Sequence, residues 1–273
     1  MKNQSGRTVL ITAGGTSEPI DNIRSISNTG TGTLGSIIAD VFASDPQVES
    51  IIYVHGRGSV LPRSERAECI EAAYTQRLQD TIRKILTERR VDAIIHSMAV
   101  SDYCVKSVVR SEDLVKVIEK AGKSCCAAED QACCTTEEQS NAADFNSALL
   151  EASCGFDLRD IDNKIPSSAG TPVIFLQPTP KIIPELRQLA PKSVVVGFKL
   201  VDDVAQEELC SVAKRLMEKN DCDFVLANDY TTVKAGKHTG YLMARSGGYE
   251  TFVGKPAIAE GIYQAVKKAW RQK

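Results

Sequence analysis

Five short segments of the chain are nearly continuous runs of apolar residues, many of them β-branched. Between these runs lie longer segments in which apolar residues recur at helical spacing. Strands that are apolar on both sides are typical of parallel sheets with helices on both faces. The predicted strands are TVLITAG (8–14), SIIYVHG (50–56), DAIIHSMAV (92–100), SVVVGFKL (193–200) and DFVLAND (223–229).

The alternation of strands and helices predicts an α/β fold with a doubly wound, mostly parallel, Rossmann-like sheet. Near the end of the chain, GYLMARSGGYETFVG (240–254) predicts a hairpin, and a last helix is expected from Pro256 to about Lys268. The helices expected between the strands are LGSIIADVFAS (34–44), EAAYTQRLQDTIRKILTERR (71–90), PKIIPELRQLA (180–190) and DVAQEELCSVAKRLMEKN (203–220).

Residues 104–160 interrupt this alternation. They are rich in Ser, Glu, Ala and Cys and only weakly periodic, so we expect a flexible insertion with one helix at EDLVKVIEKAG (112–122), within a single domain that spans 1–273. Reduced thiols are the favoured interpretation of the cysteines here, because vicinal pairs in a C-C-x6-C-C pattern are not a familiar zinc site. The five cysteines concerned are Cys125, Cys126, Cys133, Cys134 and Cys154.

The net charge and the hydropathy of the chain limit which partners the protein can bind and where in the cell it is expected. The formal net charge of −2 provides no overall field to attract nucleic acid or an anionic membrane, so any basic site must be local. The N-terminal residues contain no apolar segment of signal-peptide length, and no run of eighteen apolar residues occurs. We therefore expect a cytoplasmic protein that binds neither nucleic acid nor a membrane.

Two glycine turns are the strongest local signal of a binding site. The first follows the first predicted strand, and the second immediately precedes the helix at 34–44, whose N-terminal N–H groups and positive dipole end favour an anion. Asn28 offers an amide to a carboxylate or phosphate oxygen, or else fills a turn by bonding the backbone. The residues of the two turns are Gly14, Gly15, Thr16, Gly30, Thr31 and Gly32.

The G-x-G-x-x-G spacing that begins at Gly30 suggests a dinucleotide site, but its context is wrong for one. It does not follow the first strand directly, and the second strand ends in His55-Gly56-Arg57 without an acidic residue for a ribose. Tyr103 and Lys106 are one residue too close together for a short-chain reductase pair. An NADP-dependent reductase therefore remains only an alternative, as does a non-catalytic nucleotide-binding protein on the same sheet.

The segment ITAGGTSEPIDNIRSISNTGTGTLG (11–35) resembles the opening of phosphopantothenate-cysteine ligases, enzymes of coenzyme A biosynthesis. Four later segments agree in order, at 94–103, 164–183, 195–204 and 223–233. From this similarity we expect the stand-alone form of the family, without a fused flavin-dependent decarboxylase domain.

The resemblance implies a two-step reaction. The carboxylate of 4′-phosphopantothenate attacks the α-phosphate of a nucleoside triphosphate, which gives an acyl-nucleotide and pyrophosphate, and the amine of L-cysteine then displaces the nucleotide. Bringing two anions together requires Mg²⁺, lysines and helix N–H groups. The resemblance leaves CTP and ATP both open, and it implies a homodimer in which the partner's flap completes each site.

The resemblance also assigns residues. Asn28 matches the position that holds the pantothenate carboxylate, with Gly14, Gly15 and Gly30 to Gly32 at the phosphates. The other matched positions are Ala99 and Asp102 in the nucleotide loop, where Asp102 meets ribose or the metal, Phe198 at the base, Lys199 near phosphate, and Lys255 at the nucleotide. Asn228 and Asp229 end the fifth predicted strand, at the sheet edge where ligands bind.

Lys164 opens the segment that corresponds to the family's flap. Fused bacterial enzymes carry a K-x-K-K cluster there, and this chain retains only the first lysine. Lys164, Lys181 and Lys199 are the candidates for the phosphate contact that the missing lysines would make. The three histidines share no metal spacing and are assigned no role.

Overall fold

A computed structural model describes residues 6–128, 138–159, 164–234 and 236–272. The chain divides into two compact units. One, here called the sheet unit, comprises Met1–Ser17, Asn28–Ser101 and Pro180–Lys273. The other, the hairpin unit, comprises Glu18–Ser27 and Asp102–Thr179. The two units are described separately, and the single domain with an insertion stays a prediction.

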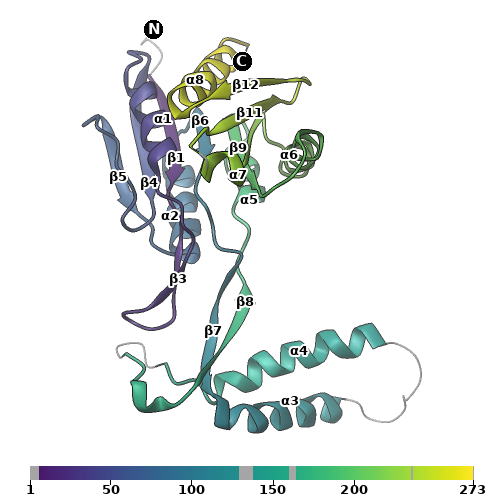
Figure 1. Cartoon of the computed structure of the whole chain (residues 1–273). Coiled ribbons are helices and arrows are strands. Elements are labelled where there is room, and N and C mark those ends of the chain that lie inside the picture. The colour runs from purple at the N-terminus through teal and green to yellow at the C-terminus, as the bar shows by residue number, and fades with distance from the viewer. Residues whose placement is uncertain (1–5, 129–137, 160–163, 235, 273) are drawn as a thin grey trace. The chain divides into compact units, whose positions relative to one another are not determined.

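An eight-stranded sheet forms the centre of the sheet unit, in the order β12-β11-β10-β9-β6-β1-β4-β5 (Figure 1). Six strands of this sheet run parallel, and they are β1, β4, β5, β6, β9 and β10. The other two, β11 and β12, form the antiparallel hairpin that the sequence predicts. The doubly wound, mostly parallel fold is therefore confirmed. The strands are β1 (Arg7–Ala13), β4 (Val48–His55), β5 (Ala67–Glu71), β6 (Ala93–His96), β9 (Val194–Val201), β10 (Phe224–Asp229), β11 (Thr239–Ala244) and β12 (Tyr249–Val253).

Helices cover both faces of this sheet. On one face, α1 (Thr33–Ala43) and α8 (Lys255–Gln272) pack on a core that includes Val9 and Ile11 of β1. Leu10, between them, belongs to the core on the other face. The strands are continuously apolar because alternate side chains enter two different cores. The helices of the second face are α2 (Thr75–Glu88), α5 (Ile183–Leu189) and α6 (Gln206–Asn220), while α7 (Tyr230–Lys234) follows β10.

The hairpin unit contains more regular structure than the sequence analysis expects. Strands β7 (Tyr103–Arg110) and β8 (Pro172–Pro178) pair antiparallel, and helices α3 (Leu114–Ala128) and α4 (Glu138–Cys154) accompany them. Val117 of α3 packs with Val109 and Val173 of the two strands. This small core explains why a second helix and a strand form where the sequence predicts only one helix. The short strands β2 (Ser17–Pro19) and β3 (Ser25–Ser27) pair with each other.

The cysteine-rich segment lies largely outside the described part of the chain. The side chains of Cys125, Cys126, Cys133 and Cys134 all lie there. Cys154 is described, and it is a free thiol exposed at the end of α4. Among the described residues, no helix has both the length and the apolar character needed to cross a membrane.

His96 provides a pH-dependent term in the stability of the sheet unit. It is buried in β6, its Nδ1 lies 2.8 Å from the Thr12 hydroxyl, and desolvation lowers its pKa from 6.5 to about 4. An imidazole whose folded pKa is depressed stabilises the fold above pH 6.5, and this contribution is lost as the pH falls toward 4. We expect about 2 kcal/mol of unfolding free energy to be lost between pH 7.5 and pH 5. Urea denaturation at pH 7.5 and pH 5 measures this loss of unfolding free energy. In His96→Asn the loss should be smaller by about 2 kcal/mol. If the pH dependence of His96→Asn equals that of the intact chain, His96 is not its source.

Candidate functional site

The order of strands reverses between β1 and β6, and the candidate site lies where these two strands end. β4 and β5 extend the sheet from β1 in one direction, and β9 and β10 extend it from β6 in the other. In open α/β sheets, ligands bind outside the carboxyl ends of the strands at such a reversal. The glycine turns of the sequence analysis lie at this edge.

Backbone hydrogen bonds join the segments that follow β1 and β6. Gly15 and Ala99 form an isolated parallel bridge. The Ala99 N–H donates to the Gly14 carbonyl oxygen at 2.8 Å, and the Thr16 N–H donates to the Ala99 carbonyl oxygen at 3.1 Å. Three predicted site positions in the first turn and one in the nucleotide loop are thus held together by the backbone alone.

The two glycine turns are in direct backbone contact. A Cβ on Gly30 would lie 2.5 Å from the Gly14 carbonyl oxygen, and one on Gly15 would lie 2.5 Å from the Asn28 carbonyl oxygen. A Cβ on Gly56, which follows β4, would overlap the Gly15 carbonyl oxygen. No side chain fits at these three contacts, so glycine is required for the packing of the turns. Gly56 was not among the predicted site residues, although a glycine directly after a buried strand is a visible signal.

Helix α1 begins immediately after the second turn. Its N-cap residue, Gly32, has a positive φ of 75°, and no side chain caps the helix. The Thr31 hydroxyl lies 2.9 Å from that of Thr33 and 3.4 Å from the Thr33 amide nitrogen. A helix start whose N-cap residue has no side chain presents N–H groups and a positive dipole end, which is the chemistry of an anion site.

Asn28 is exposed, and it joins this cluster through both its backbone and its side chain. Its N–H donates to the Thr16 carbonyl oxygen at 3.1 Å. One N–H of its side-chain amide donates to the Ala99 carbonyl oxygen at 3.0 Å. The side chain therefore bonds the backbone of a segment 71 residues away, rather than that of its own turn. This geometry fits a bracing role, and it also leaves a second amide N–H on the same nitrogen.

Phe198 and Lys199 lie near the end of the neighbouring strand β9, on opposite faces. Phe198 is half-buried against the core beneath α1 and α8. Lys199, paired with Ala227 of β10, is also half-buried. Alternation along the strand thus sends these two candidate side chains in different directions.

Asn228 and Asp229 are engaged by the protein itself. The buried Asn228 amide donates to the Thr239 carbonyl oxygen at 3.0 Å, which ties β10 to β11. Asp229 Oδ1 accepts the Thr231 hydroxyl at 2.7 Å and the N–H groups of Thr231 and Asp203. These bonds, the Thr231 hydroxyl first, lower the pKa of the Asp229 carboxyl. Any ligand contact by these groups must compete with bonds that shape the loop.

Lys255 is the first residue of α8, and it lies near a histidine that the sequence analysis left without a role. Burial, and then the charge of Lys255, lower the pKa of His238. His238 has a φ of 32°, and its Nε2 is buried without a hydrogen-bond partner among the described residues. No feature of the surrounding sequence indicates this environment, because it depends on how α8 follows β12.

Asp102 and Lys164 belong to the hairpin unit. Asp102 is exposed, and its carbonyl oxygen accepts the Thr179 N–H at 3.0 Å. Lys164 is also exposed, and it directly precedes Ile165, whose N–H donates to Asp21 at 3.1 Å. The structure therefore brings together Gly14, Gly15, Thr16, Asn28, Gly30 and Ala99, and it describes Asp102 and Lys164 only within their own unit.

A known family covers most of the chain. The sequence model for the DNA/pantothenate metabolism flavoprotein C-terminal domain matches residues 4–121 and 152–269. Both glycine turns, Asn28 and every other predicted site residue fall within these two segments.

Individual proteins agree with this match. The chain is 27% identical over 234 residues to the coenzyme A biosynthesis bifunctional protein CoaBC of Thermococcus kodakarensis, which covers 86% of this chain and 43% of that protein. The chain thus spans less than half the length of that relative. The crystal structure of the DNA/pantothenate metabolism flavoprotein from Streptococcus pneumoniae superposes with a TM-score of 0.73 at 26% identity, covering 97% of this chain and 100% of that one.

A more distant structure shares the fold. The Cab2 variant H337A in complex with phosphopantothenate-cysteine superposes with a TM-score of 0.62 at 15% identity, covering 98% of this chain and 89% of that one.

Proposed function

Because the chain belongs to the DNA/pantothenate metabolism flavoprotein C-terminal domain family, we propose that it is a ligase that joins 4′-phosphopantothenate to L-cysteine in coenzyme A biosynthesis. The observation that carries the proposal is the cluster of two glycine turns, Asn28 and the start of α1 at the point where the strand order reverses. The name of the Thermococcus relative supports a role in coenzyme A biosynthesis, and the compound bound to Cab2 supports the substrates. We place the enzyme in the cytoplasm.

The proposed reaction proceeds through an acyl-nucleotide. A carboxylate oxygen of 4′-phosphopantothenate attacks the α-phosphorus of CTP or ATP, and pyrophosphate leaves with the electrons of the broken P–O bond. The amine of L-cysteine then attacks the acyl carbon, the nucleoside monophosphate leaves, and the ammonium proton passes to solvent. Neither step demands a strong acid or base, so catalysis rests on holding two anions in line.

The residues at the reversal point suit that task. The start of α1 and the turn at Gly30 offer N–H groups to oxyanions, and the Asn28 amide is the group proposed to hold the carboxylate. Lys199 and Lys255 of the sheet unit are the cations proposed to offset the triphosphate charge. Lys164, in the hairpin unit, stays a candidate on the family resemblance alone. Phe198 is the residue proposed to contact the base.

We propose Mg²⁺ as the companion of the nucleotide, as the family resemblance implies. Among the described residues, no group of three or more His, Cys, Asp or Glu side chains is placed to hold a metal. Mg²⁺ commonly keeps several waters and binds one or two carboxylates together with substrate phosphates, and Asp102 is the carboxylate we propose. When bound, the ion would neutralise phosphate charge.

Release of pyrophosphate tests the proposed function. The protein is mixed with 4′-phosphopantothenate, L-cysteine, Mg²⁺ and either CTP or ATP, and pyrophosphate and the amide product are measured. Formation of both supports the ligase and reveals the nucleotide. Binding of nucleotide without turnover would favour the non-catalytic alternative, and NADPH oxidation would favour the reductase.

The first step should occur without L-cysteine. We expect labelled pyrophosphate to exchange into the triphosphate when 4′-phosphopantothenate and nucleotide are present, because the acyl-nucleotide forms before the amine is needed. Omitting 4′-phosphopantothenate is the control and should abolish exchange. If amide forms but no exchange occurs, the stepwise route is wrong while the ligase remains.

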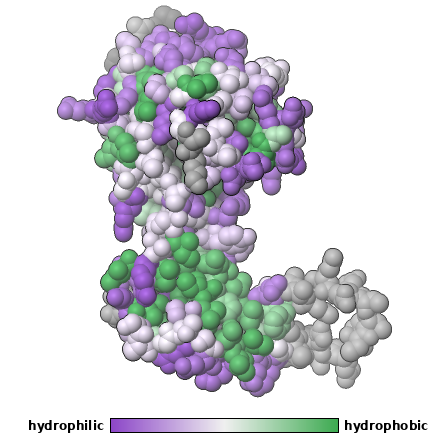
Figure 2. All heavy atoms as spheres, viewed as in Figure 1, coloured by the Kyte–Doolittle hydropathy of each residue, from purple (hydrophilic) through white to green (hydrophobic). Residues whose placement is uncertain are grey.

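We further infer a homodimer, and the hairpin unit supports it. Ile174 and Leu176 of β8 are 37% and 40% exposed, whereas Val173 and Phe175, on the other face of the strand, pack into the core. Figure 2 shows hydrophobic surface over this unit. A second copy would cover this face. Light scattering should give twice the monomer mass for the intact chain and the monomer mass after Ile174→Asp with Leu176→Asp; a monomeric intact chain would contradict the inference.

A further inference from the structure

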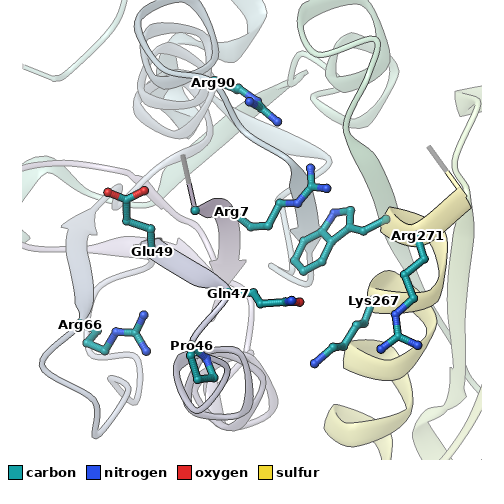
Figure 3. A pocket seen from close by; sticks show the side chains of 10 residues that line it. Arg7, Pro46, Gln47, Glu49, Arg66, Arg90, Lys267 and Arg271 are labelled. Atoms are coloured by element: carbon teal, nitrogen blue, oxygen red, sulfur yellow. The ribbon is translucent and has the colours of Figure 1, made fainter. Parts of the chain in front are cut away.

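A charged cavity lies in the sheet unit, at the edge opposite the glycine turns. Its volume is about 760 Å³, and its lining comes from the starts of β1 and β4, from loops before β5 and β6, and from the last turns of α8 (Figure 3). Arg7 begins β1, whereas Gly14 follows the end of that strand. None of the predicted site residues lines this cavity.

Positive charge dominates the lining. Among the residues that line the cavity, the only carboxylate is that of Glu49, and Figure 3 shows it pointing away from Lys267 and Arg271. The chain as a whole carries a net charge of −2, so this concentration of cations is local. The cationic side chains are Arg7, Arg66, Arg90, Lys267 and Arg271.

Two buried carboxylates fix some of these cations in place. Asp92, 7% exposed, accepts Arg7 at 2.9 Å and Arg90 at 2.7 Å. Asp45, 4% exposed, accepts Lys267 at 2.9 Å. A guanidinium has five N–H donors, so each arginine retains donors for a ligand after its bond to Asp92. The cations are therefore held in position while their remaining donors are available to the cavity.

The other two arginines of the lining, Arg66 and Arg271, are not held by a buried carboxylate within the described ranges. Arg66 donates to the carbonyl oxygens of Ala43 and Val48, which are neutral acceptors. Arg271 is exposed in the last turn of α8 and has no carboxylate partner in the part of the chain that is described. Among the described residues, neither guanidinium forms an ion pair with a carboxylate.

The lining favours a ligand with negative charge over a ligand with an aromatic ring. The Trp270 indole is only 7% exposed, its N–H donates to the Asp92 carbonyl oxygen at 3.1 Å, and the Arg7 guanidinium lies over its ring at 5.5 Å. A nucleobase therefore finds no open ring face here. Arginine forks match the oxygens of phosphate groups, and several forks around one cavity match several linked phosphates.

We propose that this cavity binds a compact oligophosphate anion, either free or as the phosphate end of a larger molecule. The site is separate from the glycine turns, because it occupies the other edge of the same sheet. Its occupancy bridges the start of β1 and the end of α8, and it stabilises the folded sheet unit by mass action.

The only tryptophan of the chain, Trp270, lines the cavity, so its fluorescence reports on this site. The full chain is titrated with sodium tripolyphosphate at constant ionic strength, with citrate and chloride as other anions, and melting temperature is measured in parallel. We expect saturable binding of tripolyphosphate in at least one readout, weaker binding of citrate, and no saturable response to chloride. Pyrophosphate and ADP in two further titrations distinguish the sources: ADP binding as tight as that of pyrophosphate identifies a phosphate end, and much weaker ADP binding identifies a free anion.

Charge variants localise the binding. Arg271→Glu should weaken tripolyphosphate at least tenfold, since it replaces a charged donor by a repelling acid. Gln47→Glu places a carboxylate on the lining without breaking any ion pair, and it should weaken binding in the same direction. Arg215→Glu, on the exposed face of α6 and outside the cavity, is the matched control and should bind like the intact chain.

Three results would overturn the proposal: no saturable response in either readout, an equal response to chloride at the same ionic strength, or intact binding in both cavity variants. Gly30→Ala, in the turn proposed to hold the phosphates, separates this site from the proposed active site, because it should leave the tripolyphosphate response unchanged. Loss of the response in Gly30→Ala would place the anion at the glycine turns instead.

Discussion

Replacement of Gly30 by alanine will lower kcat/KM for 4′-phosphopantothenate by about a hundredfold or more. The new Cβ would lie 2.5 Å from the Gly14 carbonyl oxygen and 2.8 Å from its carbonyl carbon, and both are backbone atoms that no rotamer change can move away. The two glycine turns must therefore separate. A displacement of about 1 Å at a positioning site costs on the order of a hundredfold in rate.

The same substitution should lower stability only moderately. Overpacking of this kind costs about 1–3 kcal/mol of unfolding free energy, so the protein stays folded while the turns shift. Gly122→Ala is the matched control, because a Cβ on Gly122 of α3 meets nothing within 4 Å. That variant should keep full activity and melt at the same or a slightly higher temperature.

Steady-state kinetics and thermal melting of Gly30→Ala and Gly122→Ala test whether the second glycine turn positions the substrates. Near-normal turnover in Gly30→Ala would mean that the second glycine turn does not position the substrates. If Gly30→Ala does not fold, Gly15→Ala is measured instead. Its Cβ would lie 2.5 Å from the Asn28 carbonyl oxygen, at a neighbouring contact of the same cluster.

The central strands could be predicted from the sequence because both of their faces are buried. Val9 and Ile11 enter one core and Leu10 enters the other, so these three consecutive positions of β1 are all apolar. Strand β5 was missed because it is an edge strand, and Glu68 and Cys69 along it are exposed. A strand with one buried face carries too short a pattern to distinguish it from a loop.

The hairpin unit could not be predicted for a related reason. β7 and β8 are far apart in the chain and pair with each other alone, and β8 alternates between half-buried and exposed positions. The exposed positions of β8 include the apolar residues Ile174 and Leu176, so the strand lacks the alternation of apolar and polar residues that marks a half-buried strand. Its stability depends on Val117 and Ala152 packing from α3 and α4, which are contacts between distant segments.

At the candidate site, the sequence identified positions better than roles. Strand ends and glycines located both turns, because each follows from local chain geometry. The bonds made by Asn228 and Asp229, and the contact of Gly56 with Gly15, depend on which strands become neighbours. That order is set by the packing of the whole sheet, and no short segment encodes it.

Asn28→Ala should lower kcat/KM for 4′-phosphopantothenate by about thirty- to two-hundredfold. If the amide holds the carboxylate that becomes the acyl-phosphate, its loss removes a hydrogen bond to a charged group, worth about 2–3 kcal/mol in the transition state. The bond to the Ala99 carbonyl oxygen is lost as well, but it is exposed and should cost no more than about 1 kcal/mol of stability.

The bracing role of Asn28 predicts a different pair of results, and a second asparagine provides the reference for it. Asn220→Ala removes the same kind of bond, from the side-chain amide to the Leu216 carbonyl oxygen at 2.8 Å, at the end of α6 just before β10 and therefore at the opposite edge of the sheet. It should lower the melting temperature without affecting turnover. If Asn28→Ala behaves like Asn220→Ala, less stable but nearly fully active, then Asn28 only ties the first glycine turn to the segment after β6, and the carboxylate must be held by the N–H groups at the start of α1 alone.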